Sequence, residues 1–262
     1  MKLATWNVNS LKVRLPHVLD WLASSQTDVL CLQELKLEQE AFPEAELAAA
    51  GYGAAWFGQK TYNGVAILTR LPLAPRDVVR GMPNYPDPQS RVIAATVGDI
   101  RVICAYFVNG EAITSDKYQY KLAWLAALQH YVAGEMRQHD GRVVLLGDFN
   151  IAPADSDVYD PAAWQDKVLC SQPERAAFEG LLALGLTDGF RRFHPDTVAY
   201  SWWDYRAAMF RRNLGLRIDH ILYGHALAER VRDAAIDTTP RRWERPSDHT
   251  PVWLALDDSF ST

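Results

Sequence analysis

A carboxylate and an amide lie two residues apart where a predicted buried strand ends. The apolar run Val143–Gly147 is followed by Asp148 and Asn150. On an extended backbone, residues i and i+2 point to the same face, so both side chains are expected to project together. Their oxygens suit a hard divalent cation and the water or phosphate that it binds. This spacing predicts a site for metal and phosphate chemistry.

Other polar residues also lie at the ends of predicted strands. They are Asn7, Glu34, Tyr106, Asp219, Asp248 and His249. Ligands of sheet proteins gather at strand carboxyl ends, where loops meet, so we expect these residues to join Asp148 and Asn150 in one site.

Each of these residues has a structural alternative. Asn7 could form an Asx turn, Glu34 could be a surface charge, and Tyr106 could be a core tyrosine. Asp219 lies within an apolar strand, where a buried carboxylate needs a partner. Its neighbour His220 would face the opposite side of the strand and is interpreted as structural.

Short apolar strands alternate with helices along the chain. Strands are expected at 3–6, 29–32, 65–68, 91–97, 101–107, 143–148, 217–223, 230–236 and 251–256. Helices are expected at 14–23, after a cap at Thr114 or Ser115, and from Pro173 to Gly185. This mixture of hairpins and crossovers favours an α/β fold with two packed sheets and helices outside. No boundary divides the chain, so residues 1–262 are expected to form a single domain.

The composition is that of an ordinary globular protein, with 48% hydrophobic and 23% charged residues. Three cysteines without a Cys-x-x-Cys motif indicate reduced thiols in a cytoplasmic protein. The N-terminus lacks the apolar stretch of a signal peptide, and no apolar run approaches the roughly 20 residues of a membrane span. A membrane partner is therefore not expected.

The net charge of −5 argues mildly against nucleic acid as a partner. It is a weak guide where a metal supplies the local positive charge. Two arginine clusters, each interpreted as a solvated face, are formed by Arg206, Arg211, Arg212 and Arg217 and by Arg241, Arg242 and Arg245.

Several segments together resemble a known family. They are Thr5–Ser10 (TWNVNS), Leu32–Lys36 (LQELK), Tyr62–Ala66 (YNGVA), Gly147–Pro153 (GDFNIAP), Leu216–His220 (LRIDH) and Ser247–Pro251 (SDHTP). The chain resembles the exonuclease III class of abasic-site (AP) endonucleases, within the endonuclease/exonuclease/phosphatase superfamily. The resemblance runs from residue 2 to about residue 256. The TWNVNS segment and Tyr200–Arg206 are more typical of its DNA-repair branch.

The resemblance implies a four-layer α/β sandwich of the DNase I type, with two mixed sheets face to face. It implies hydrolysis of the phosphodiester 5′ to abasic sites and removal of nucleotides or blocking groups from 3′ ends. The implied cofactor is Mg²⁺, for which Mn²⁺ would substitute. The implied partner is double-stranded DNA with abasic sites or 3′ ends, bound by a monomer.

The resemblance also implies roles for individual residues. The metal would be held by Glu34 directly, with Asn7, Asp148, Asn150, Asp248 and His249 as the other candidates. The catalytic residues would be Tyr106, Asp148, Asn150, Asp219 and His249, with Asp148 as the first candidate for general base and His249 as the second. DNA would be contacted by Asn109, Trp202, Arg206, Leu216 and Ile218. Trp202, Leu216 and Ile218 would line an apolar pocket for a flipped-out abasic sugar, and one of Trp202 and Trp203 would be a core residue.

Two other functions stay open at this point. One is a member of the superfamily that acts on a non-DNA phosphoester, either a phosphatase of inositol phosphates or a sphingomyelinase-like lipid hydrolase. The other is a binding module without activity. The segment Tyr200–Arg206 disfavours the former, and the intact set of Glu34, Asp148, Asn150 and His249 disfavours the latter.

Overall fold

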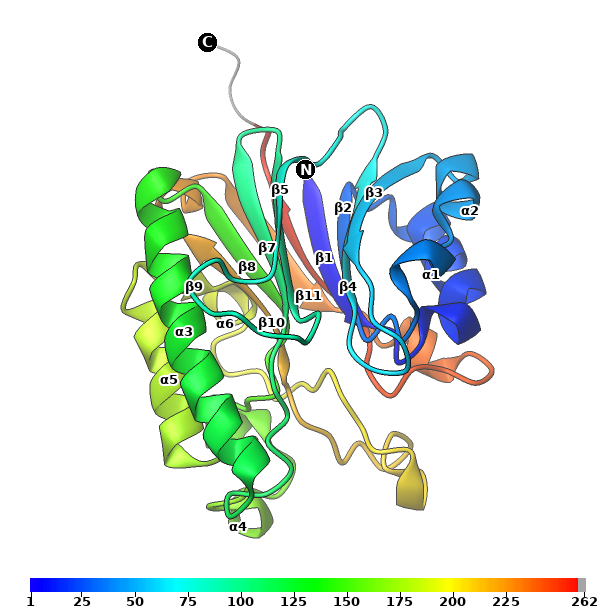
Figure 1. Ribbon diagram of the computed structural model, residues 1–262. Helices are drawn as coiled ribbons and strands as arrows, with labels where there is room; N and C mark the ends of the chain where they lie inside the picture. Colours follow the sequence, from blue (N-terminus) through cyan, green and yellow to red (C-terminus); the bar gives the residue numbers. More distant parts are fainter. Residues whose placement is uncertain (259–262) are drawn as a thin grey trace.

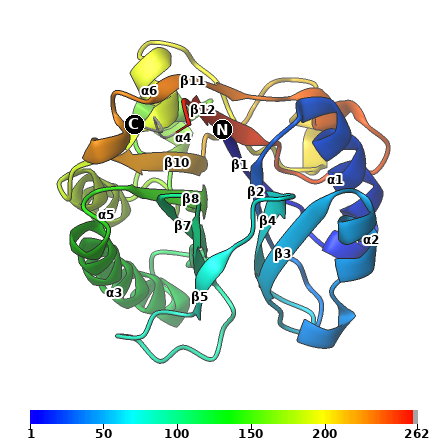
Figure 2. The same cartoon turned by 90° about the horizontal axis from the view of Figure 1, so that it is seen from above.

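Two six-stranded mixed sheets pack face to face with helices on their outer sides (Figures 1 and 2). This computed structural model describes residues 1–258. Seen from above in Figure 2, α1 and α2 cover one outer face, and α3 and α5 cover the other. The predicted four-layer α/β sandwich is thereby confirmed. No helix among the described residues is long and apolar enough to cross a membrane.

Sheet A has the strand order β11-β12-β1-β2-β4-β3. Its strands are β1 (Lys2–Asn7), β2 (Val29–Gln33), β3 (Tyr52–Phe57), β4 (Val65–Arg70), β11 (Val231–Ile236) and β12 (Val252–Leu256). β1 and β2 are parallel, and β12 runs antiparallel to β1. The carboxyl ends of β1 and β2 and the amino end of β12 therefore lie at the same edge.

Sheet B has the order β5-β6-β7-β8-β10-β9. Its strands are β5 (Arg76–Arg80), β6 (Val92–Val97), β7 (Ile100–Tyr106), β8 (Val143–Asp148), β9 (Leu186–Asp188) and β10 (Asp219–Gly224). β7 and β8 are parallel and pair Tyr106 with Asp148, while antiparallel β10 pairs Asp219 with Asp148. Three residues predicted for the site therefore lie side by side at one end of this sheet.

The helices are α1 (Leu11–Ser25), α2 (Glu44–Ala49), α3 (Asp116–Gln138), α4 (Pro161–Trp164), α5 (Gln172–Leu182) and α6 (Gly189–Phe193). The hydroxyl of Ser115 caps α3 by accepting from the amide of Tyr118, which resolves the predicted choice between Thr114 and Ser115. Ser171 and Glu174 form a capping box at the start of α5. One apolar cluster fills the space between the sheets, and further clusters join each sheet to its helices.

Some elements differ from the sequence-based expectation. β3, β5, β9, α2, α4 and α6 were not expected. Small residues in β3 and charged residues in β5 weaken the apolar alternation of those two strands. β10 begins at Asp219 rather than at Arg217. Leu216 instead bridges to Trp202 and Val158, and buried Arg217 is held by ion pairs away from the sheet.

Gly147 allows β7 and β8 to approach closely. Its φ is 155°, and a Cβ atom there would lie 1.8 Å from the carbonyl oxygen of Ala105. We expect Gly147→Ala to lower the free energy of unfolding by about 3 kcal/mol or more, because both atoms belong to rigid backbone. Urea denaturation measures this change.

The matched control is Gly134→Ala within α3, where a Cβ atom would meet a single side-chain atom at 4.0 Å. This change is expected to stabilise the protein by up to about 1 kcal/mol, since alanine is the better helix former. A Gly147→Ala variant as stable as the parent would contradict the close approach of the two strands.

Candidate active site

Two buried carboxylates face one buried imidazole where the sheets end. Nδ1 of His249 lies 2.9 Å from Oδ2 of Asp219, and Nε2 lies 3.6 Å from Oδ2 of Asp148. All three side chains are buried. The hydroxyl of Ser201 donates to Asp219 at 2.6 Å and fixes the carboxylate behind the ring. The imidazole is thereby oriented with Nε2 toward Asp148.

The opposed charges shift the pKa values of this array. Burial raises the pKa of Asp148 to about 7, although the adjacent His249 acts in the opposite direction. Burial alone would lower the pKa of His249, but the carboxylates of Asp219 and Asp148 raise it to about 10. Protonated His249 can therefore donate at neutral pH, while Asp148 is poised to exchange a proton there.

Asn7 connects the two sheets at this point. Its Nδ2 donates to Oε1 of Glu34 and to Oδ2 of Asp148, each at 2.9 Å. Its Oδ1 accepts from the amide of Asn9 at 3.0 Å. The amide nitrogen, not the oxygen, therefore faces the carboxylates, and a direct metal ligand at Asn7 would require the amide group to turn over.

Asn150 lies beside Asp148, but not for the reason expected from the sequence. β8 ends at Asp148, and Asn150 has a left-handed backbone with φ 49°, so the extended i, i+2 geometry does not apply. Instead, the Asn150 amide donates to Oδ1 of Asp148 at 2.9 Å. Nδ2 donates to the carbonyl of Phe107, and Oδ1 accepts from exposed Asn109. The second Nδ2 hydrogen is left to donate to a ligand.

Tyr106 ends β7 next to Asp148 and lies under the guanidinium of Arg91, whose Cζ is 4.9 Å from the ring centroid. Burial, reinforced by the carboxylates of Glu34 and Asp148, raises the pKa of Tyr106 well above its ordinary value. The phenol is therefore protonated at neutral pH.

Glu34, Asp148 and His249 could hold a metal ion. Among the described residues they form a group whose ligand atoms lie within 4.8 Å of one another. Carboxylate oxygens suit a hard cation, and a cation would offset the cost of burying the Asp148 carboxylate. The donor set thus fits a divalent metal. Asp248 lies outside this group, and its carboxylate accepts from Asn9 at 3.1 Å and from Trp202 at 3.0 Å.

The residues predicted to contact DNA have different exposures. Trp202 is partly exposed and packs on Leu216 and Ile218, which are themselves buried. Trp203 is buried, as expected for one of the two tryptophans. Arg206 is exposed and paired with Asp204 at 2.5 Å.

The arginine clusters are not uniformly solvated. Arg217 is buried between Asp157 and Asp188, and Arg241 is buried over the rings of Trp203 and Phe210. The interpretation of both clusters as solvated faces was therefore wrong for these two residues, because each has found buried partners.

Two residues of the site were not assigned a role from the sequence. Lys36 lies 3.0 Å from Oε2 of Glu34 and donates to Oδ1 of Asn9, and Ser201 holds Asp219. Both belong to segments that carried the family resemblance. Their place in those segments was the signal by which the sequence could have pointed to them.

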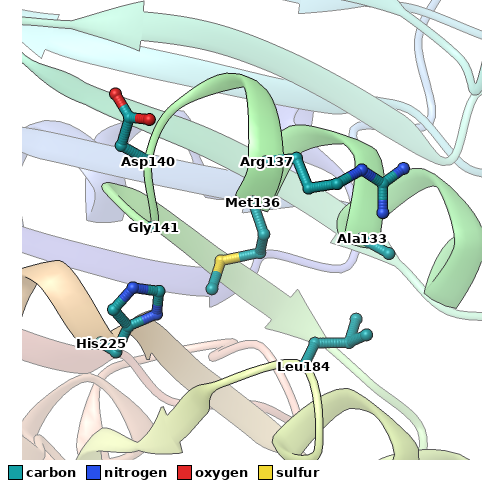
Figure 3. A pocket seen from close by; sticks show the side chains of 7 residues that line it. All are labelled: Ala133, Met136, Arg137, Asp140, Gly141, Leu184 and His225. Carbon is teal, nitrogen blue, oxygen red and sulfur yellow. The ribbon is translucent and has the colours of Figure 1, made fainter.

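A surface hollow at the end of α3 does not belong to this site. It is lined by Met136, Arg137, Asp140, Gly141 and His225, among others (Figure 3). Gly141 precedes β8, so the hollow lies at the opposite end of that strand from Asp148.

The comparisons with known proteins show the family of this chain. Residues 4–249 match the endonuclease/exonuclease/phosphatase family, so the chain belongs to that family. It is 38% identical to exodeoxyribonuclease III of Haemophilus influenzae, with 97% of this chain and 98% of the relative covered.

Two solved structures show the same similarity. A 3′ phosphatase from Neisseria (NExo), bound to a product DNA hairpin, is 56% identical with a TM-score of 0.96, over 98% of this chain and all of that one. An AP endonuclease from Archaeoglobus fulgidus is 40% identical with a TM-score of 0.94, over the same shares. The predicted resemblance to the exonuclease III class is confirmed.

His220 is structural, as its orientation predicted. Its Nδ1 accepts from Arg217 at 3.1 Å and its Nε2 donates to the carbonyl of Ile151 at 2.9 Å. Burial and the charge of Arg217 lower the pKa of His220 to about 4. The ring is therefore neutral and supports the loop that carries Asn150.

This buried ring predicts a pH dependence of stability. Unfolding frees His220 to bind a proton near pH 6.5, whereas the folded protein binds it only near pH 4. The parent therefore loses stability as the pH falls from about 6.5 to about 4. The glutamine of His220→Gln can still donate to the carbonyl of Ile151 but does not titrate. In this variant, the part of the pH dependence of stability that comes from His220 should disappear. Thermal unfolding at pH 7, 6 and 5 measures it.

Exposed His130→Gln is the control and should keep the parental slope. An unchanged slope in His220→Gln would show that the ring is already protonated in the folded protein or titrates normally.

Proposed function

We propose that this protein is a Mg²⁺-dependent DNA-repair nuclease that hydrolyses the phosphodiester 5′ to abasic sites and removes nucleotides or blocking groups from 3′ ends of duplex DNA. The observation that carries the proposal is the buried Asp148–His249–Asp219 array with Glu34 beside it. Support comes from the exodeoxyribonuclease III, AP endonuclease and 3′ phosphatase to which the chain is similar.

Glu34 and Asp148 are the proposed metal residues, and Asn7, Asn150, Asp248 and His249 lie around them. Mg²⁺ usually retains several waters, so one or two carboxylates suffice as direct protein ligands. The bound ion would neutralise charge on the phosphate and on the departing 3′ oxygen.

The protein groups account for the proton transfers of the reaction. Ionised Asp148 accepts a proton from the attacking water. The water oxygen bonds to phosphorus as the bond between phosphorus and the 3′ oxygen breaks. His249, held by Asp219, donates to the phosphate oxygens, and so does Nδ2 of the Asn150 side chain. Protonated Tyr106 supplies a proton to the departing 3′ oxygen. Each donor is already protonated at neutral pH or has a free amide hydrogen.

Selection of the substrate is assigned to the surface beside Trp202. We propose that a sugar without a base packs against Trp202, which lies on the buried cluster of Leu216 and Ile218, and that a complete nucleotide is excluded there. Extruding a damaged nucleotide also costs less than extruding a stacked one. Asn109 and Arg206 are both exposed and are proposed to contact the DNA backbone. We propose that the enzyme acts as a monomer of one domain in the cytoplasm.

Incubation with labelled duplexes tests the proposal. A 5′-labelled duplex with one tetrahydrofuran residue should be cut 5′ to the analogue with Mg²⁺, and not in EDTA. A duplex with a 3′-phosphorylated nick should lose phosphate under the same conditions. Mn²⁺ should restore activity after EDTA treatment. Release of phosphate from inositol phosphates with no cleavage of either duplex would overturn the assignment to DNA.

Substitution of Asp148 tests its role. Asp148→Asn should lower kcat on the tetrahydrofuran duplex by about 10³-fold, since the water loses its proton acceptor. Stability should hold or rise, because the cost of burying the charge is removed.

Asp99→Asn, which removes a partly exposed carboxylate paired with Arg230, is the control and should turn over like the parent. A fully active Asp148→Asn variant would remove Asp148 from the reaction.

A further inference from the structure

A lysine ammonium is completely buried behind the candidate active site. Lys121 belongs to α3 and forms an ion pair with Glu174 of α5, and both side chains are 0% exposed. Its Nζ also donates to the carbonyl of Asn150 at 2.7 Å and to the carbonyl of Asn109 at 3.1 Å. One cation therefore connects two helices with the loops that follow β7 and β8.

The ammonium is itself held firmly. Glu174 also accepts from the amides of Leu169 and Ser171, at 3.0 and 3.1 Å, and from the hydroxyl of Ser171 at 2.5 Å. The Ser171 hydroxyl lies 2.7 Å from the hydroxyl of Tyr118. Three donors besides Lys121 thus fix the carboxylate, and the carboxylate fixes the ammonium.

The Asn150 carbonyl is a sensitive point of attachment. The amide of the same residue donates to Oδ1 of Asp148, and its side chain contacts Phe107 and Asn109. Asn150 has a left-handed φ of 49°, a conformation that asparagine adopts more readily than most residues. The carbonyl that Lys121 holds and the backbone N–H that holds Asp148 belong to the same residue, so a displacement of the Asn150 backbone would move the donor to Oδ1 of Asp148.

A buried ion pair is a poor source of stability, because desolvation offsets most of the attraction between the charges. Its contacts with the two loops suggest another use. We propose that Lys121 is a positioning residue that sets Asn150, and through it Asp148, for the reaction. This inference rests on the proposed nuclease function for its catalytic part, while its structural part can be measured independently.

The test removes both charges together, so that no unpaired charge remains. In Lys121→Met/Glu174→Gln, glutamine keeps a side-chain acceptor for the α5 capping box. The variant should unfold at a denaturant concentration close to that of the parent. Its kcat on the tetrahydrofuran duplex should fall about 10- to 100-fold, with most of the loss in kcat rather than in KM, because a small displacement of reacting groups is costly.

The matched control is the other buried pair of α3. Arg101 and Glu135 lie 2.5 Å apart with side chains 4% and 9% exposed, and neither contacts the loops of the site. Arg101→Met/Glu135→Gln should keep the parental kcat even if it is less stable.

Two further measurements exclude a merely structural role. In an Asn150→Ala background, the added loss of kcat from Lys121→Met/Glu174→Gln should be at least about fivefold smaller than in the parent, because both changes act through Asn150. Hydrogen exchange at residues 149–152 should be faster in Lys121→Met/Glu174→Gln, and unchanged in the Arg101 control.

The outcomes separate this inference from the proposed function. A parent that cleaves no DNA overturns the nuclease assignment, yet hydrogen exchange still decides whether Lys121 orders the loop. Any of three results would overturn the positioning role. The Lys121 variant of an active parent could keep the parental kcat, or hydrogen exchange at residues 149–152 could be unchanged. The third is that the losses of kcat from Asn150→Ala and from Lys121→Met/Glu174→Gln simply multiply when the changes are combined.

Discussion

The candidate site places more carboxylates than cationic side chains together at the end of the two sheets, and the rest of the structure depends on this excess of negative charge. Asp148, Asp219 and Glu34 surround a single imidazolium, so the site has an unbalanced negative charge even with His249 protonated. Lys36 reaches Glu34 from the rim, but Asp148 has no lysine or arginine partner among the described residues. Such a site is stable only where a proton or a cation balances the carboxylate, and this constraint couples the fold to metal and phosphate chemistry.

The packing of the two sheets sets the geometry of this site. Asn7 ends β1 and Glu34 follows β2 in sheet A, while Tyr106 and Asp148 end strands of sheet B, so no single sheet contains the whole candidate site. The Nδ2 atom of Asn7 spans the gap by donating to both carboxylates. A shift of one sheet along the other would separate the groups, and the apolar contacts between the sheets therefore determine the chemistry as directly as the polar residues do.

The sequence predicted which residues would meet, but not how they are held. Apolar runs that end in polar residues place Asp148 and Tyr106 at strand ends, and that pattern is local. Asn150 reaches Asp148 through a left-handed turn, and Lys121 reaches its carbonyl from a helix nearly 30 positions away. Periodicity within α3 indicates a buried face, but the partner that a buried lysine finds is a property of the tertiary structure.

The same limit applies to charge and explains how an acidic protein can approach DNA. In the sequence the seven clustered arginines are equivalent, yet Arg217 and Arg241 are internal and Arg206 is paired with Asp204. Arg211 and Arg212 are exposed on the same loop as Arg206. Because a net charge of −5 repels a polyanion at long range, attraction to DNA has to be local. In the proposed function it would come from these few guanidinium groups and from a cation at Glu34 and Asp148. In the proposed reaction, the residual negative charge of the site would therefore contribute to substrate binding as well as to hydrolysis, because it would recruit the ion that the phosphate needs.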